Sequence, residues 1–200
     1  VIIATGSENR KLGLENEEVL TGKGVSYCAT CDGAFYKGKK VAVVGGGNTA
    51  LEDALYLSNV AEKVYLVHRR DEFRGAEASV EKLKEKQNVE FVLNSVVTKL
   101  LANDKLQALE VTNSDGSTRT IEVDGVFVAV GRAPENQGFA ELVTLDDAGY
   151  VVASENCHTN TEGIFVAGDT RTKEVRQLVT ATSDGAIAAT EAIKYLNDQN

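Results

Sequence analysis

The sequence predicts an α/β fold in which short buried strands alternate with helices. The first observation is an apolar run at 40–44, a helix-period pattern over 48–58 and a second apolar run at 64–67. A strand, a helix and a strand in succession are typical of a parallel sheet. The second observation is composition, because 42% of the 200 residues are hydrophobic and 18 Gly accompany a single Pro. This balance provides a real core and many tight turns.

The other elements of the first half follow from local patterns. A buried strand is predicted at 1–6, and it ends at a tight turn. The polar, glycine-punctuated stretch 7–24 is expected to be a connection with little regular structure. A charged surface helix is predicted over 77–86, and a third strand at 89–93.

The second half combines a meander with a return to buried strands. Alternating polar and apolar residues over 96–123 predict antiparallel strands, with a hairpin turn at 113–116. Buried strands are predicted at 125–131 and at 164–167. The pattern over 175–197 predicts a final helix whose small residues permit close approach to another element.

Charge, hydropathy and cysteine content exclude several classes of protein. The net charge of −9 argues against a nucleic-acid-binding surface. No apolar run approaches the ~20 residues that would cross a bilayer. Three cysteines are too few for a disulfide scaffold and suit a reducing compartment, so we expect a cytoplasmic protein that is not in the membrane. Because the sequence opens on Val1-Ile2-Ile3 with neither Met nor a basic leader, we also expect a fragment of a longer chain.

A glycine motif follows the strand at 40–44. The string Gly45-Gly46-Gly47-Asn48-Thr49-Ala50 fits the form G-x-G-x-x-A, and it opens the predicted helix. Gly45 permits the turn, Gly47 lets the backbone approach a pyrophosphate, and Ala50 keeps the helix close to the strand. The start of the helix offers unpaired N–H groups to phosphates. We therefore predict a dinucleotide site that includes Gly45, Gly47, Asn48, Thr49 and Ala50.

Basic residues end the second strand, about 20 residues after the glycines. An NAD-binding unit usually has Asp or Glu here to bind the ribose 2′-hydroxyl. This sequence has His68-Arg69-Arg70, with Arg74 four positions beyond Arg70. Guanidinium groups bind a 2′-phosphate bidentately. A solvated basic cluster is the plainer interpretation, but the spacing from the glycine motif favours NADPH as the dinucleotide.

Cys28 and Cys31 form a C-x-x-C pair, followed by Asp32. Such a pair is a redox centre, half of a zinc site, or two unrelated thiols. A structural zinc site needs four ligands, and the only other candidates are Cys157, His158 and His68, which form no second pair. We therefore favour a dithiol/disulfide couple and expect no metal. Asp32 is either a proton donor and acceptor for that couple or a turn residue before Gly33.

Four motifs in order resemble the low-molecular-weight, bacterial-type thioredoxin reductases over essentially the whole sequence. They are Tyr27-Cys28-Ala29-Thr30-Cys31-Asp32-Gly33-Ala34-Phe35, Val43 to Ala50, His68 to Arg74, and Gly163 to Asp169 with Arg176-Gln177 and Ala181 to Gly185. The resemblance implies the pyridine nucleotide-disulfide oxidoreductase fold. It also implies a homodimeric flavoprotein in which an NADPH domain is inserted into an FAD domain.

The same resemblance implies roles for individual residues. Hydride would pass from NADPH to FAD and then to the Cys28–Cys31 disulfide. Cys31 would lie nearest the flavin, Cys28 would attack the disulfide of thioredoxin, and Asp32 would be the acid/base. Arg69, Arg70 and Arg74 would hold the 2′-phosphate, beside His68. The FAD contacts would come from Thr5, Gly6, Gly168, Asp169, Arg176 and Gln177, although Asp169 is also a plausible turn or cap residue.

The sequence departs from the family at two points. It has one glycine fingerprint where the family has two, so we expect the first FAD-binding βαβ to be missing. The predicted domains are then 1–8 (end of the first FAD segment), 9–133 (Rossmann-like three-layer NADPH domain with the C-x-x-C) and 134–200 (second FAD segment). Gly75 also stands where the family more often continues into helix, and we expect it to loosen that helix start.

Three alternatives remain. One is a reductase of another disulfide client, such as the flavoprotein subunit of an alkyl hydroperoxide reductase, against which the arginines argue. A second is a ferredoxin–NADP reductase of similar fold, against which the cysteine pair argues. The third is a non-catalytic NADPH-binding module whose cysteines bind metal.

Overall fold

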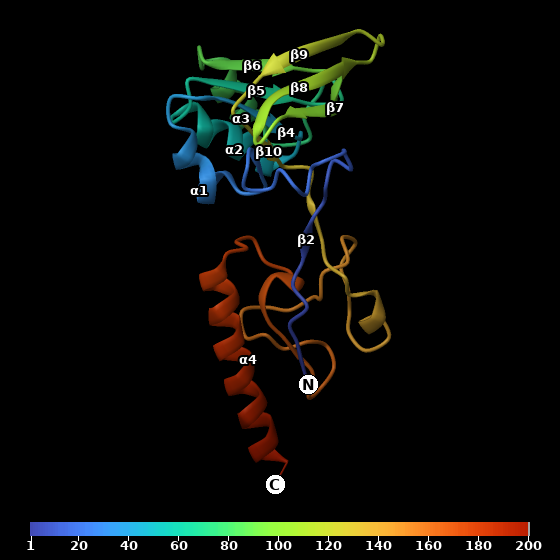
Figure 1. The fold of residues 1–200 in the computed structure, drawn as a ribbon. Coiled ribbons are helices and arrows are strands. Elements are labelled where there is room, and N and C mark those ends of the chain that lie inside the picture. The colour runs from blue at the N-terminus through green and yellow to red at the C-terminus, as the bar shows by residue number, and fades with distance from the viewer. Residues whose placement is uncertain (200) are drawn as a thin grey trace. The chain divides into compact units, whose positions relative to one another are not determined.

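The computed structural model describes residues 1–199, which form two compact units. Unit 1 combines Val1–Asn9 with the segment from Arg132 onward, and unit 2 is Arg10–Gly131. Figure 1 traces the chain through both units. The sequence placed residues 9, 132 and 133 in the dinucleotide domain. In the structure they belong to unit 1, because Arg132 and Ala133 pair with Asn9 and Glu8.

Unit 2 is built on a five-stranded sheet with the order β3-β10-β4-β5-β6, and every neighbouring pair is parallel. The strands are β3 (Val25–Ser26), β10 (Gly125–Val128), β4 (Lys40–Val44), β5 (Lys63–Val67) and β6 (Val89–Val92). All residues of β4 after Lys40 are buried. A continuous buried run is typical of a parallel strand that is covered on both faces.

Two different layers cover the two faces of this sheet. Val41 and Val43 of β4 pack with α2 (Asn48–Ser58) and α3 (Glu77–Lys84). The alternate residues Ala42 and Val44 pack with an antiparallel meander, because successive side chains of a strand point to opposite faces. The meander strands are β7 (Ser95–Ala102), β8 (Leu106–Asn113) and β9 (Thr118–Glu122). The predicted α/β fold with three layers is confirmed.

In unit 2, the sequence predicted one local feature, the hairpin turn at 113–116, but it did not predict two short helices. Gly116 has φ +85° and donates its N–H to the Asn113 carbonyl at 2.9 Å, so the predicted hairpin turn is present. The short helices α1 (Ala29–Asp32) and η1 (Gly33–Tyr36) follow β3 and had no sequence signal. They are only four residues each, too short for a helical period to appear.

Unit 1 consists of two strand pairs, short turns and one long helix. β1 (Ile2–Ile3) pairs in parallel with β12 (Phe165–Val166), and β2 (Glu8–Asn9) pairs antiparallel with β11 (Arg132–Ala133). The turns η2 and η3 are Gln137–Phe139 and Gly168–Thr170. The helix α4 (Leu178–Asp198) is the long red helix of Figure 1.

The helix α4 begins three residues later than the sequence pattern indicated. Gln177 is its N-cap residue, and the Gln177 N–H donates to Thr180 Oγ1 at 3.1 Å. This capping box satisfies donors that the first turn would leave unpaired, and so it fixes the start of the helix. Within residues 1–199, α4 is not apolar enough to cross a membrane, and neither is any other helix.

Candidate functional site

The glycine loop, residues 45–47, joins β4 to α2 and is crowded at two of its three positions. A Cβ on Gly45 would lie 2.3 Å from the Ala129 carbonyl oxygen, and a Cβ on Gly46 would lie 2.0 Å from the His68 ring. A Cβ on Gly47 would meet nothing within 4 Å. The first two glycines therefore permit close packing, whereas Gly47 borders open space at the start of α2. That opening fits a pyrophosphate approaching the free N–H groups of the helix.

The residues after β5 form the arginine loop, which we define as residues 69–76. Arg69, Arg70 and Arg74 are all exposed. The backbone N–H of Arg74 donates to the Gly46 carbonyl at 2.8 Å, so the arginine loop and the glycine loop are neighbours. This contact places the backbone of the arginine loop beside the predicted phosphate site, and guanidinium groups on that loop fit a dinucleotide with a 2′-phosphate.

His68 is placed differently from the arginines. Its side chain is buried, it stacks on Phe73 at 5.1 Å between ring centroids, and its Nε2 lies 3.1 Å from the Glu72 carbonyl oxygen. Burial lowers the pKa of His68, and the positive charges of the three arginines lower it further, against the Glu72 hydrogen bond. The packed imidazole lies against Gly46 of the glycine loop, and its lowered pKa disfavours the charged form that would attract a phosphate.

Cys28 and Cys31 are joined by a disulfide, with 5.3 Å between their Cα atoms. Cys28 is the N-cap residue of α1, and its Sγ accepts a hydrogen bond from the Cys31 N–H at 3.2 Å. The helical turn brings residues i and i+3 together, which is why this spacing can close a disulfide. Cys31 is exposed and Cys28 half-buried, so the bond is accessible to a reaction partner. Because the two sulfurs are bonded to each other, they are not available here as zinc ligands.

Ser26 is a neighbour of the disulfide that the sequence did not single out. Its hydroxyl donates to Asp32 Oδ2 at 2.7 Å and accepts from the Cys28 N–H at 3.1 Å. Ser26 is also buried, on β3. It therefore holds the Asp32 carboxylate next to the backbone of the redox pair. Only the tertiary arrangement of β3 and α1 reveals this bridge, since a lone serine carries no motif.

Phe35 is the second feature near the disulfide that sequence analysis passed over. It lies four residues after Cys31, and 74% of its surface is exposed. Aromatic side chains are enriched at protein–protein interfaces relative to the rest of the surface. The available signal was an aromatic residue four positions after the redox motif, in a stretch with no apolar period.

In unit 1, the residues predicted to contact FAD gather after β12. Asp169 pairs with Arg132, with 3.2 Å between Oδ2 and Nη2. The buried Asp169 Oδ1 and Arg176 Nε have no hydrogen-bond partner among residues 1–199. Buried polar atoms without partners are rare and need a specific explanation, and a bond supplied by a bound ligand is one such explanation. This donor and acceptor pair fits a polar cofactor such as FAD.

The other predicted FAD contacts are held by hydrogen bonds inside unit 1. Thr5 Oγ1 lies 3.1 Å from Asn136 Oδ1 and 2.8 Å from Thr170 Oγ1. Gly6 and Gly168 adopt φ of +74° and +80°, which favours glycine at both turns. Gln177 caps α4. Arg176 stacks its guanidinium on the Tyr150 ring, with the Arg176 Cζ 4.1 Å from the ring centroid.

A buried ion-pair network beneath this turn was missed by sequence analysis. Arg171 donates to both carboxylate oxygens of Asp184, from Nε at 2.8 Å and from Nη2 at 2.9 Å. Lys173 and the Gly168 N–H also donate to Asp184 Oδ2, at 2.8 and 2.9 Å. These bonds fasten the turn that carries Asp169 to α4. Asp184 lies in the motif Ala181 to Gly185, but the motif does not indicate these ion pairs, because their partners are brought together by the fold.

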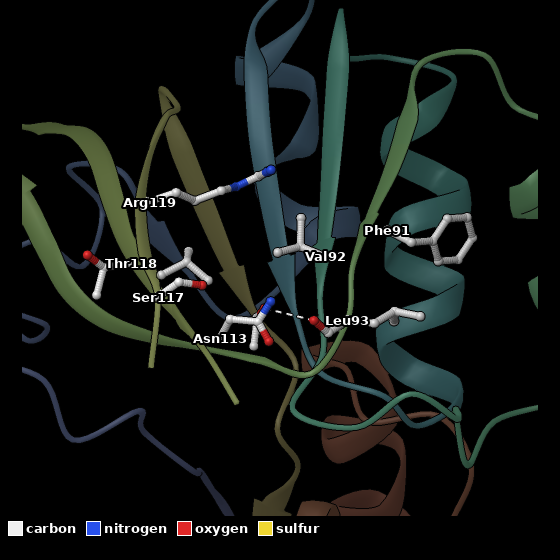
Figure 2. Close-up of a pocket in the computed structure, with 9 residues that line it drawn as sticks. Phe91, Val92, Leu93, Asn113, Ser117, Thr118 and Arg119 are labelled. Carbon is white, nitrogen blue, oxygen red and sulfur yellow. Dashed lines mark hydrogen bonds between the residues drawn. The ribbon is translucent and has the colours of Figure 1, made fainter. Parts of the chain in front are cut away.

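A pocket of about 220 Å³ lies between the end of β6 and the β8–β9 hairpin. Figure 2 shows Val92 from the sheet, and Asn113 and Arg119 from the hairpin, around it. The Arg119 guanidinium donates to Glu90 Oε1 at 2.7 Å, so its charge is already paired. None of the predicted site residues lines this pocket.

Comparison with known proteins agrees with this geometry. The family model "Pyridine nucleotide-disulphide oxidoreductase" matches residues 1–185. The chain therefore belongs to the pyridine nucleotide-disulphide oxidoreductases, a class that the disulfide and the glycine loop in one unit also indicate.

Within that family, the chain is similar to several proteins named thioredoxin reductase. The thioredoxin reductase of Listeria monocytogenes is 46% identical over 200 residues, which cover 99% of this chain and 63% of the relative. That of Mycoplasma genitalium is 48% identical over 190 residues, covering 94% of this chain and 60% of the relative. The crystal structure of thioredoxin reductase from Streptococcus pyogenes has a TM-score of 0.92 and 40% identity, covering 99% of this chain and 65% of that one. The resemblance inferred from the sequence is confirmed, and the chain spans about three-fifths of the length of these curated relatives.

Proposed function

We propose that this chain belongs to an NADPH-dependent flavoprotein that reduces the disulfide of thioredoxin. The observation that carries the proposal is the accessible Cys28–Cys31 disulfide, which shares a compact unit with the glycine loop and the arginine loop. A disulfide in a dinucleotide-binding unit suits the transfer of reducing equivalents from a nicotinamide to a thiol pair.

The proposed dinucleotide contacts are divided between two loops. Gly45, Gly47, Asn48, Thr49 and Ala50 form the pyrophosphate cradle at the start of α2. Arg69, Arg70 and Arg74 bind the 2′-phosphate. His68 supports the cradle, since its ring is buried against Gly46.

The redox pair and the cradle lie at opposite ends of α2. Gly33, two residues after Cys31, contacts Tyr56 and Leu57 in the last turn of α2, whereas Gly47 precedes its first turn. The 11 residues of α2 span roughly 16 Å at 1.5 Å per residue. Because reacting atoms must approach to about 3–3.5 Å, we propose that an intermediate carrier links the bound nucleotide to the disulfide.

FAD is the proposed carrier, and when bound it accepts hydride from NADPH and passes two electrons to a disulfide. Its contacts in unit 1 would be Thr5, Gly6, Gly168, Asp169, Arg176 and Gln177. The unpaired atoms of Asp169 and Arg176 support this assignment. Reduction of the Cys28–Cys31 bond by two electrons and two protons gives two thiols, and Asp32, held by Ser26, is proposed to move one of those protons.

Thiol–disulfide exchange completes the proposed reaction. The Cys28 thiolate attacks one sulfur of the thioredoxin disulfide, which releases the other sulfur as a thiolate. Cys31 then attacks Cys28 in the mixed disulfide, which re-forms the Cys28–Cys31 bond and frees reduced thioredoxin.

The proposal includes a homodimer in the cytoplasm. Leu178 and Val179 in the first turn of α4 are 85% and 74% exposed, and Ile193 and Leu196 near its end are 61% and 60% exposed. Apolar residues at this density on one helix support an assembly contact.

A single variant tests the proposal in the full-length protein. Replacing Cys31 by Ser removes the disulfide and leaves both nucleotide sites intact. We expect thioredoxin reduction to be lost while NADPH still bleaches the flavin absorption at the normal rate. Cys157→Ser, at a buried free cysteine in unit 1, is the matched control and should retain activity. Persistent thioredoxin reduction by the Cys31→Ser protein would refute the disulfide relay.

A further inference from the structure

The arginine loop is fastened to the glycine loop at its C-terminal end by two backbone donors. The Arg74 N–H donates to the Gly46 carbonyl at 2.8 Å. The Ala76 N–H donates to the Asn48 side-chain oxygen Oδ1, also at 2.8 Å. Asn48 is the first residue of α2, and Ala76 is the N-cap residue of α3. The two helix starts are therefore tied to each other directly.

Gly75, between these two donors, sits where no larger residue fits. A Cβ at this position would lie 2.5 Å from Leu51 Cδ1, 2.9 Å from Asn48 Oδ1 and 3.0 Å from the Asn48 backbone nitrogen. Leu51 is fully buried, and the Asn48 nitrogen belongs to the helix backbone, so neither can move aside cheaply. Gly75 is thus required by close approach. This differs from the sequence expectation that it loosens the start of α3.

The N-terminal end of the loop is fixed as well. The His68 ring fills the space above Gly46, and the same ring stacks on Phe73. Both ends of the arginine loop therefore rest on the glycine loop. The exposed arginine side chains extend from a backbone whose position relative to the phosphate cradle is set by contact.

We propose that Gly75, together with the Asn48–Ala76 hydrogen bond, forms a latch that sets the preference of this chain for a 2′-phosphorylated nucleotide. The latch holds the backbone of Arg74 against Gly46, so that one nucleotide reaches the cradle and the Arg74 guanidinium at once. Gly75 is a positioning residue that acts through Arg74. This inference rests on the proposed function, which assigns the 2′-phosphate to the arginines.

The experiment measures the 2′-phosphate contribution alone, without flavin or nicotinamide. Isothermal titration gives the affinity of the chain for 2′,5′-ADP and for 5′-AMP, which differ by the 2′-phosphate, and the ratio is the readout. In Gly75→Ala the added methyl group forces the loop off α2. We expect the ratio to fall about tenfold, as for the loss of one charge-assisted hydrogen bond, while 5′-AMP affinity changes less than about threefold.

Controls separate the latch from a general loss of structure. Gly138→Ala, where a Cβ would meet nothing within 4 Å, should leave the ratio unchanged. Arg74→Ala should lower the ratio by itself, and adding Gly75→Ala to it should lower the ratio little further, because the two residues act as one unit. If Gly75→Ala does not fold, Ala76→Pro provides a second test. Proline has no N–H, so this variant removes the hydrogen bond from Ala76 to Asn48, and the φ of −60° at this position suits proline. It should lower the ratio too.

The possible failures are distinguishable. If the unmodified chain binds both nucleotides equally, the proposed NADPH preference fails and the latch with it. If the unmodified chain prefers 2′,5′-ADP but a folded Gly75→Ala chain keeps that ratio, the latch alone is overturned. Additive losses in the double variant would also overturn it, since Gly75 would then not act through Arg74.

Discussion

The variant Asp184→Asn tests whether the ion pairs of Asp184 stabilise unit 1, in which they connect α4 to the turn after β12. The carboxylate is 3% exposed and accepts hydrogen bonds from Arg171, from Lys173 and from the Gly168 N–H. Asparagine has nearly the same shape but carries no charge, and its amide nitrogen cannot accept a hydrogen bond. Among residues 1–199, the Arg171 guanidinium, 1% exposed, would keep only the largely exposed Glu155 as an ionic partner.

The magnitude follows from the pKa of Asp184. Burial raises this pKa, but hydrogen bonds from Arg171 and Lys173 outweigh burial and bring it from 3.8 down to about 2. A lowered pKa in the folded state means that the ionised carboxylate stabilises the fold, here by roughly 2–3 kcal/mol. Leaving a buried guanidinium without its partner costs about 3–5 kcal/mol. We therefore expect Asp184→Asn to lower the free energy of unfolding of unit 1 by about 3 kcal/mol.

Urea unfolding at pH 7, followed by far-UV circular dichroism, measures this loss, because α4 contributes much of the helix of the chain. With a slope of about 2 kcal/mol per molar urea, the midpoint of unit 1 should fall by about 1.5 M. Asp198→Asn changes an exposed carboxylate on the same helix and should shift the midpoint by less than about 0.3 M. An Asp184→Asn midpoint within that same margin would refute the reasoning.

The pH dependence gives the same variant a second signature. Because the pKa of Asp184 is lower in the folded state than in the unfolded state, its stabilisation is complete above about pH 4. The stabilisation is lost as the pH falls through about 2. The unmodified chain should therefore lose roughly 2–3 kcal/mol of stability over this window that Asp184→Asn does not lose.

Three further predictions concern unit 2. Gly45→Ala places a Cβ 2.3 Å from the Ala129 oxygen, so 5′-AMP affinity by calorimetry should fall at least about tenfold, and normal affinity would contradict the cradle. Phe35→Ala should raise the KM for thioredoxin about tenfold with the KM for NADPH unchanged, and an unaltered thioredoxin KM would exclude Phe35 from docking. Burial, with a smaller effect of Glu52, raises the pKa of Asp53 to about 6. The free energy of unfolding should therefore fall as the pH rises from about 4 to about 6. Asp53→Asn should remove that fall and be more stable at pH 7 by up to about 3 kcal/mol in urea unfolding, whereas an equal fall in both proteins would refute it.

The parts of the fold that could be predicted are those in which sequence order and spatial contact coincide. β4, the glycine loop, α2 and β5 follow each other along the chain and pack on each other, so their periodicity and glycines carry the information. The hairpin turn before Gly116 is local in the same sense. The start of α4 was misplaced by three residues because a capping box, and not apolar spacing, decides it.

The sequence predicted the motifs of the candidate site, but it did not predict the contacts that hold the motif residues in place. The cysteine pair, the glycines and the arginines each have a spacing with a chemical reason. Ser26 and Asp184 have none, since their importance arises from neighbours brought close by β3 and by α4. Gly75 is the clearest case, because sequence alone suggested a weak helix start, and only the distances to Asn48 and Leu51 show a tight contact.

The region around the turn after β12 contains one buried carboxylate whose hydrogen bonds are satisfied and two side chains with a buried polar atom that lacks a partner. Asp184 is buried and fully engaged by cations, whereas Asp169 and Arg176 each keep one buried atom without a partner among residues 1–199. An unsatisfied buried polar group costs about 1–3 kcal/mol, a penalty similar in size to the stabilisation that the Asp184 ion pairs provide. Such a turn would relax by rotating its side chains toward solvent if it were not held. The ion pairs of Asp184 prevent that, because they fix Gly168 and Arg171 on either side of Asp169. Asp184 therefore holds the turn that carries Asp169, and the proposed cofactor would meet polar atoms that are already in place.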